Sequence, residues 1–332
     1  MTPAPGFRPA GPDDLPECAE VWQTGMTDYL RRLNQPVVAG DLEPLRRLLA
    51  HVLATDRDRF WVATRRDESA PGGPERVVGF SAATERGATW FLSMLFVLPE
   101  EQAAGCGREL LGRAFPGGRP PRTPPPVARA DDRPILATAT DSAQPISSAL
   151  YSRYGIVPRL PVFHFVGRPG RPAVLPQLPT GITPVPFDTL AAGPPDGRGH
   201  REVVGAIGSI DRELLGYEHP EDHRFLRTDG RIGYLYRGPD GAPVGYGYAS
   251  PVGRVGPVAA LDEALLAPIV GHLLAAVEPR GASSLWIPGA ADRTFRALLE
   301  AGIRIEGFPA LFCGDRPFAS FERYLPISLA LI

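Results

Sequence analysis

The sequence predicts an α+β protein built from two similar units in tandem, each a mixed, largely antiparallel sheet flanked by helices. The chain has 332 residues, which is enough for two domains of ordinary size. Strand-like and helix-like patterns alternate along it, as they do in α+β domains. Their order over residues 6–166 returns in weaker form after residue 181, which indicates a duplicated domain rather than a solenoid of short repeats.

The first half begins with a short strand and a helix. Asp13 or Asp14 can cap the start of this helix, and Pro16 suits its first turn. Apolar residues then recur at helical spacing, and residues 41–54 form a second amphipathic pattern. The later elements follow in order: strands over 60–66, 76–85 and 89–97, a helix after residue 102, a strand over 135–140, a helix over 144–155 and a strand over 162–167.

Two proline-rich segments interrupt these patterns. Residues 116–134 contain too much proline for a helix or a strand, so we expect an exposed loop insertion there. Residues 167–181 have the composition of a linker. We therefore predict an N-terminal domain over residues 1–166, a linker over 167–181 and a C-terminal domain over 182–332.

The composition excludes several classes of function. The formal net charge is −2, so the chain lacks the basic footprint of a general nucleic-acid binder. No apolar run approaches the roughly 20 residues that span a bilayer, and we expect no membrane partner. Cys18, Cys106 and Cys313 are too scattered for a disulfide framework or a zinc cluster, which favours a reducing cytoplasm. We expect a monomer or a homodimer.

The stretch "VLPEEQAAGCGRELL", residues 97–111, carries the main functional signal. An apolar strand ends near Pro99, small residues follow, and a helical pattern begins at once. The first amides of a helix have no intrahelical partner and lie at the positive end of its dipole, so they form an anion site. Gly105 and Gly107 leave room for a phosphate to approach the backbone. The Walker A and dinucleotide-binding fingerprints both fail here, because the required lysine and glycine spacing are absent.

This stretch resembles the coenzyme A signature of the GNAT superfamily of N-acetyltransferases. The segments "FRPAGPDDLPE" and "ALYSRYGI" also resemble the start and the late helix of that family, so the resemblance covers residues 6–166. It implies a mixed sheet that is splayed between its fourth and fifth strands. The signature matches at the end of the strand and in the loop: Val97, Pro99, Gln102, Gly105 and Gly107.

The resemblance implies that acetyl-CoA lies in this splay. Its pantetheine arm would pair with backbone groups of the fourth strand, and its pyrophosphate would lie on the amides of the loop. Gln144 stands where the family often has an asparagine that contacts pantetheine. The implied cofactor-binding residues are Leu95, Phe96, Val97, Gln102, Ala103, Ala104, Gly105, Cys106, Gly107, Arg108 and Gln144.

The resemblance also implies an acyltransferase that moves an acetyl group directly to a primary amine of a small molecule or a peptide. Tyr151 stands at the position of the general acid that protonates the departing thiolate, and Tyr154 is the fallback. The fourth strand offers no Glu or His as a general base. Glu85 is therefore the first candidate, with Asp28, Asp141 or an ordered-water relay as alternatives: any of these could accept a proton from the amine.

The second half resembles a copy of the same domain that has lost cofactor binding. No Gln-x-x-Gly-x-Gly motif follows "GRVGPVAA", and Asp262 and Glu263 at the next helix start would repel a pyrophosphate. Leu298 stands where Tyr151 stands in the first half. We expect this degenerate unit to pack against the active copy, to shape the acceptor cleft or to dimerise.

The histidines offer little evidence of a metal site. His219 and His223 have the i, i+4 spacing of metal ligands on a helix. Pro220 intervenes, however, and no third ligand is evident. We therefore predict a loop or surface role for both residues, and we predict no metal.

Two other functions stay open. A non-catalytic acetyl-CoA-binding sensor or interaction protein is favoured by the lack of an evident base and opposed by Tyr151. A tandem enzyme similar to mycothiol synthase is the other alternative. In that family, however, the C-terminal copy carries the intact loop.

Overall fold

The computed structural model describes residues 4–37, 40–66, 73–102, 105–116, 133–190 and 197–332. Contacts divide the chain into two compact units. Unit 1 comprises residues 1–85, 89–138 and 149–156, and unit 2 comprises residues 86–88, 139–148 and 157–332. Most of the proline-rich segment 116–134 lies outside the described residues. No described helix is both long and apolar enough to cross a membrane.

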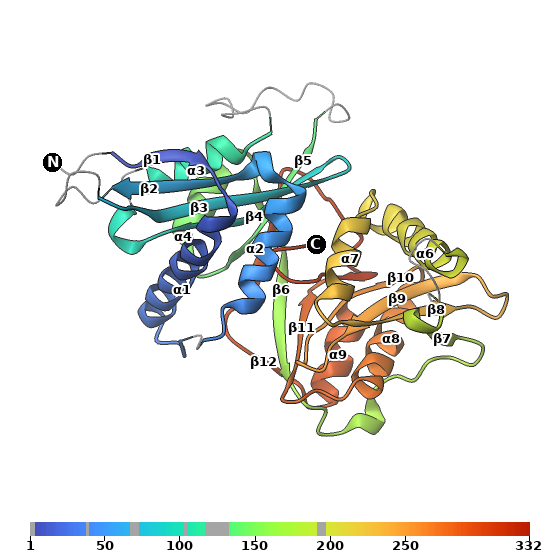
Figure 1. Ribbon diagram of the computed structural model, residues 1–332. Coiled ribbons are helices and arrows are strands. Elements are labelled where there is room, and N and C mark those ends of the chain that lie inside the picture. Colours follow the sequence, from blue (N-terminus) through green and yellow to red (C-terminus); the bar gives the residue numbers. More distant parts are fainter. Residues whose placement is uncertain (1–3, 38–39, 67–72, 103–104, 117–132, 191–196) are drawn as a thin grey trace. The chain divides into compact units, whose positions relative to one another are not determined.

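Unit 1 is built on a sheet with the strand order β1–β2–β3–β4–β5 (Figure 1). β2 pairs antiparallel with β1 and with β3, whereas β4 pairs parallel with β5. The mixed sheet predicted from the sequence is therefore confirmed. The strands have these bounds: β1 Gly6–Pro9, β2 Phe60–Arg66, β3 Glu75–Arg86, β4 Thr89–Val97 and β5 Ile135–Asp141.

Helices cover both faces of this sheet. The ring of Trp22 in α1 meets Phe96 of β4 edge-on, with the ring centroids 6.3 Å apart. Leu110 of α3 and Val97 of β4 both lie against the open face of Gly79. Phe96 and Val97 are consecutive in a strand and point to opposite faces, so α1 and α3 lie on opposite sides of β4. The helical elements are η1 Pro12–Asp14, α1 Leu15–Arg32, α2 Glu43–Thr55, η2 Arg57–Arg59, η3 Pro99–Glu101, α3 Cys106–Ala114 and α4 Pro145–Ser152.

The start of α1 differs in detail from the sequence-based prediction. The carboxylate of Asp14 accepts a hydrogen bond from Gly11 N–H at 2.7 Å, and it forms a bidentate ion pair with Arg8 at 2.7 Å. Asp14 therefore closes the 3-10 turn that precedes α1 and does not cap α1 itself.

Unit 2 contains an antiparallel sheet in the order β14–β10–β9–β8–β7 and a second group in which β6 pairs with β11, β12 and β13. The predicted hairpin that echoes the one in unit 1 is present as β8 and β9. Contacts assign β6 to this unit, although the sequence placed it before the linker. The elements are β6 Val157–Gly167, η5 Pro172–Val174, β7 Thr183–Pro186, α5 Phe187–Leu190, α6 Arg198–Leu215, α7 Pro220–Thr228, β8 Ile232–Arg237, β9 Pro243–Ala249, β10 Val255–Ala260, α8 Glu263–Ala276, β11 Ser283–Pro288, α9 Asp292–Glu300, β12 Arg304–Ile305, β13 Ala310–Gly314 and β14 Tyr324–Leu325.

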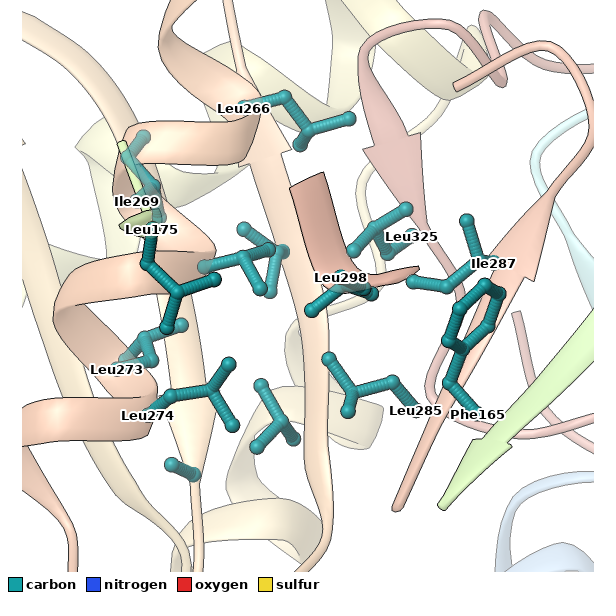
Figure 2. Packing of buried hydrophobic residues seen from close by; sticks show 14 of the residues in the cluster. Phe165, Leu175, Leu266, Ile269, Leu273, Leu274, Leu285, Ile287, Leu298 and Leu325 are labelled. Carbon is teal, nitrogen blue, oxygen red and sulfur yellow. The ribbon is translucent and has the colours of Figure 1, made fainter. Parts of the chain in front are cut away.

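The core of unit 2 lies between α8 and β11. Figure 2 shows side chains of α8 on one side of this cluster and Leu285, Ile287 and Phe165 on the other. Leu298 of α9 is 1% exposed and lies in the same core. Each fully buried leucine or isoleucine contributes about 1.5–3 kcal/mol through its removal from water. Position 298, the counterpart of Tyr151, therefore serves packing.

The segment predicted as a linker is tied to unit 2. Leu175 is 6% exposed and belongs to the core cluster. The Pro176 carbonyl lies so close to Gly271 of α8 that a Cβ there would approach it to 2.6 Å. Arg168 donates hydrogen bonds to the carbonyls of Pro279 and Gly281. An apolar side chain, a close backbone contact and hydrogen bonds together hold this segment against the domain.

The two neighbouring histidines are buried. His219 is 0% exposed and His223 is 7% exposed. The surface role predicted for them is therefore wrong. His219 directly precedes α7 and His223 lies in its first turn, where α6 and β9 cover them.

Candidate cofactor-binding site

The junction between β4 and α3 is held by side chains and backbone together. Leu98 N–H donates to the Val78 carbonyl at 2.9 Å, and Gln102 Nε2 donates back to the Val97 carbonyl at 3.0 Å. Glu101 is only 7% exposed, and both of its carboxylate oxygens accept hydrogen bonds from Arg65. The turn is therefore anchored on both sides before the helix begins.

The N-terminus of α3 presents backbone amides. Gly105 precedes the helix with φ +85°, a left-handed conformation that costs other residues about 1–2 kcal/mol. The first intrahelical bond runs from Glu109 N–H to the Gly105 carbonyl at 3.1 Å. The amides of Cys106, Gly107 and Arg108 precede that bond, so they point out of the helix at the positive end of its dipole.

Side chains of the predicted loop have different surroundings. Arg108 is exposed, and its Nη2 lies 3.5 Å from the point that a Cβ on Gly105 would occupy. Cys106 is 3% exposed, and burial, with a smaller effect of Glu101, raises the pKa of its thiol to about 11. Cys106 is therefore a packing residue with no sign of nucleophile activation. Ala103 and Ala104 lie outside the described residues.

β4 and β5 pair over only part of their length. Residues Thr89 to Leu92 register against Ile135 to Thr138, and Thr138 Oγ1 donates to the Leu92 carbonyl at 2.8 Å. β4 continues for five residues past Leu92, to Val97. Its last three residues, Leu95, Phe96 and Val97, are partly exposed while the rest of the strand is buried. The end of β4 that leads to the loop is therefore partly exposed and lies beyond its ladder with β5.

The predicted general acid is buried. Tyr151 of α4 is 5% exposed, so little of its side chain contacts water. Tyr154, the fallback, packs on Phe115 with the ring centroids 5.9 Å apart. Gln144 precedes α4 and is partly exposed, but contacts group it with unit 2. The roles of Tyr151 and Gln144 stay predictions.

The three predicted bases have different neighbours. Glu85 lies beside the β3–β4 turn and pairs with Arg59. Val97 is eight residues from the start of β4, a distance of about 26 Å at 3.3 Å per residue. Glu85 is thus at the opposite end of β4 from the loop. Asp141 accepts a hydrogen bond from Ala143 N–H at 2.9 Å. This acceptor role occupies its Oδ1.

Asp28, the third candidate, lines a hollow in unit 1. It also pairs with Arg32 at 2.6 Å. The hollow has a volume of about 370 Å³ and runs along α1 to the residue that opens the loop. Its hydroxyl and carboxylate groups suit a polar ligand. The lining residues are Gln23, Thr24, Thr27, Asp28, Arg31 and Pro99.

The N-terminus of α8, the corresponding helix of unit 2, is capped by a side chain. Asp262 immediately precedes α8, and its Oδ1 accepts a hydrogen bond from Ala264 N–H at 2.8 Å. A carboxylate of the chain itself thus takes one of the amides at this N-terminus and places a negative charge beside it. This contact gives the expected loss of cofactor binding a geometric basis.

No protein-family model matches the sequence, and no curated protein matches it. Solved structures do. A putative acetyltransferase from Pyrococcus horikoshii aligns with 100% of this chain and 97% of its own, with a TM-score of 0.68 and 14% identity. A GCN5-related N-acetyltransferase from Sphaerobacter thermophilus covers 97% of this chain and 100% of its own, with a TM-score of 0.56 and 16% identity.

A third match bears on the number of units. A tandem GNAT protein from the clavulanic acid biosynthesis pathway aligns with 94% of this chain and 99% of its own, with a TM-score of 0.53 and 18% identity. The chain has the GNAT fold. Because a tandem protein matches over nearly its whole length, the predicted class of two α+β GNAT-like units is confirmed. The β4–β5 ladder ends at Leu92, as expected for the splay that the resemblance implies.

Proposed function

We propose that unit 1 binds acetyl-CoA and transfers its acetyl group to a primary amine. The observation that carries the proposal is the junction at the open end of β4, where a left-handed glycine turns the chain into α3. Three outward amides and the nearby Arg108 gather positive charge there. Beside it, the backbone of Leu95 to Val97 extends beyond the β4–β5 ladder.

The residues present fit this ligand. The outward amides of Cys106 to Arg108 would hold the pyrophosphate, and a Cβ on Gly105 would narrow the approach beside Arg108. The backbone groups of Leu95 to Val97 would pair with the pantetheine arm. When bound, acetyl-CoA supplies an activated thioester, whose acetyl carbon forms a bond to the amine nitrogen while the carbon–sulfur bond breaks.

The chain would supply the proton transfers. Tyr151 would donate its hydroxyl proton to the sulfur, and a carboxylate or an ordered water would accept a proton from the ammonium. We favour Asp28 as that carboxylate, because it borders the hollow that reaches Pro99. Glu85 lies at the other end of β4 and is paired with Arg59. Asp28→Asn should therefore lower turnover more than Glu85→Gln does.

A thiol-release assay with a panel of primary amines tests the reaction, and calorimetry with acetyl-CoA tests binding. We expect one binding site per chain and thiol release above the hydrolysis background with at least one amine. The absence of any binding would refute the proposal.

One observation favours the alternative of a non-catalytic acetyl-CoA sensor. Each of the named acids already has a partner: Glu85 pairs with Arg59, Asp28 pairs with Arg32, and Asp141 accepts a backbone N–H. Tight binding of acetyl-CoA without transfer to any amine in the panel would support the sensor.

A further inference from the structure

Three potential metal ligands converge inside unit 2. Asp211 lies in α6, His219 precedes α7, and His223 lies in the first turn of α7. All three are buried, and one ligand atom from each lies within 4.8 Å of the other two. The i, i+4 spacing of His219 and His223 already marks two of these ligands in the sequence. The third lies on another helix, so the chain fold is needed to reveal the set.

The far side of each ligand is held by a second group. The other carboxylate oxygen of Asp211, Oδ1, accepts a hydrogen bond from the Tyr246 hydroxyl. His223 Nδ1 lies 3.0 Å from the Tyr248 hydroxyl. His219 Nδ1 lies 3.2 Å from Asp222 Oδ2. Such outer partners, a carboxylate on a histidine above all, orient the side chains that bind metals in proteins.

One atom in the cluster has no hydrogen-bond partner. His219 Nε2 is buried and unpaired, although it lies 3.3 Å from Asp211 Oδ2. Asp222 also accepts two hydrogen bonds from Arg86, at 2.9 and 3.0 Å, so it is an ionised acceptor. A proton on His219 Nδ1 that donates to Asp222 leaves Nε2 with a lone pair in a neutral ring. Two acceptor atoms that face each other in a buried site repel, so a cation or a second proton is needed between His219 Nε2 and Asp211 Oδ2.

We propose that Asp211 Oδ2, His219 Nε2 and His223 Nε2 bind a divalent zinc ion. Ligand atoms about 2.0–2.1 Å from a tetrahedral zinc lie ~3.3–3.4 Å apart. The 3.3 Å between His219 Nε2 and Asp211 Oδ2 meets this requirement. The 2.8 Å between His223 Nε2 and Asp211 Oδ2 is a hydrogen bond, and it would lengthen by about 0.5 Å when the metal replaces its proton.

The outer hydrogen bonds permit this exchange. When His223 Nε2 gives up its proton to bind zinc, Nδ1 takes one and donates it to Tyr248. A tyrosine hydroxyl can donate or accept, so the contact with Tyr248 persists. The two imidazoles and one carboxylate form a nitrogen and oxygen ligand set that suits zinc. Because the set is buried, the ion would enter as the domain folds.

The buried charges of the cluster leave room for one more positive charge. Asp211 and Asp222 carry two negative charges and Arg86 carries one positive charge, while Glu221, 2.9 Å from Arg86, is 32% exposed and its charge is screened by water. Either a zinc ion or a second proton on His219 supplies a positive charge there. The competing account is therefore a metal-free network with an imidazolium at His219.

Metal analysis of the full chain distinguishes the two accounts. The protein is purified without a polyhistidine tag and dialysed, and its zinc is measured by mass spectrometry. We expect close to one zinc per chain. A chelator should lower the melting temperature, and zinc should restore it. Cobalt in place of zinc should give visible absorption bands that the metal-free chain lacks.

Matched variants identify the ligands. Asp211→Asn keeps the size of the side chain and should lower the zinc content at least tenfold. His272→Gln removes a histidine of the same unit that contacts Tyr236, outside the cluster, and should leave the zinc content unchanged. Wild-type protein that holds less than a tenth of an equivalent, and whose melting temperature does not respond to added zinc, would overturn the proposal. So would a folded Asp211→Asn protein that keeps its zinc.

Discussion

Two variants of Gly105, with side chains of the same size, separate the effect of charge on acetyl-CoA binding from the effect of shape at the α3 N-terminus. Gly105→Asp and Gly105→Asn both meet the strain of a φ of +85°, which Asp and Asn tolerate better than most residues. Only the aspartate places a negative charge beside the three outward amides. The ratio of the two acetyl-CoA affinities therefore reports the charge alone.

The magnitude follows from Coulomb's law. A carboxylate about 6 Å from one phosphate charge, at an effective dielectric constant of about 20, is repelled by about 2.8 kcal/mol. Solvent and salt reduce this value at an exposed loop. We expect acetyl-CoA to bind the aspartate variant at least tenfold more weakly than the asparagine variant, a difference of about 1.4 kcal/mol.

Gly155 provides the control. Its φ is +77°, and a Cβ there would meet no atom within 4 Å, so Gly155→Asp meets similar backbone strain in open space. Calorimetry should show a normal affinity for acetyl-CoA in that variant. Equal affinities for Gly105→Asp and Gly105→Asn would refute the anion site, and so would an equal loss of affinity in Gly155→Asp.

Three further predictions concern catalysis and stability. Tyr151→Phe should lower kcat by roughly 10²–10⁴-fold with little change in the KM for acetyl-CoA, and steady-state kinetics that show wild-type kcat would make Tyr151 a packing residue. Arg65→Met strands the buried Glu101 and should cost about 3 kcal/mol in urea unfolding, whereas Arg76→Met, whose pair with Glu100 is exposed, should cost less than about 1 kcal/mol; similar losses would contradict the argument. Burial raises the pKa of Asp14, but the hydrogen bonds from Arg8 and Gly11 lower it by more, so the pKa lies below the usual value of an aspartate. Its stabilisation is present above the unfolded pKa and is lost as the pH falls through the folded pKa, so melting temperatures of the wild type should decline more steeply in acid than those of Asp14→Asn.

The sequence predicts the strand, turn and helix start around the loop because their signals are local. Residues 97–111 contain a strand end, two glycines and a helix start. Each of these can be recognised from the types of residue present. The strands of unit 1 are equally local, since apolar alternation reports a pleated, half-buried surface. The expected hairpins and the mixed sheet follow from these signals.

The features that the sequence does not predict depend on contacts between residues far apart in the chain. Glu85 is named as a base from its place in the chain, but Arg59, 26 residues earlier, holds its carboxylate. Asp211 belongs to no sequence motif, and it can be recognised as a potential ligand only because α6 packs beside α7 and brings it to His223. One signal was present: the alternation "GYGY" in β9 places glycines against α8 and Tyr246 and Tyr248 toward the histidines.

The carboxylate of Asp262 competes with any anion from solution for the Ala264 N–H at the start of α8. Because it is joined to the chain one residue before the helix, its effective concentration at Ala264 N–H is millimolar or higher, and it is never diluted. A nucleotide that arrives from solution would first have to displace it. The same contact stabilises the helix by about 1 kcal/mol as an N-cap. One acidic residue at this position therefore competes with an incoming phosphate and strengthens the fold through the same hydrogen bond.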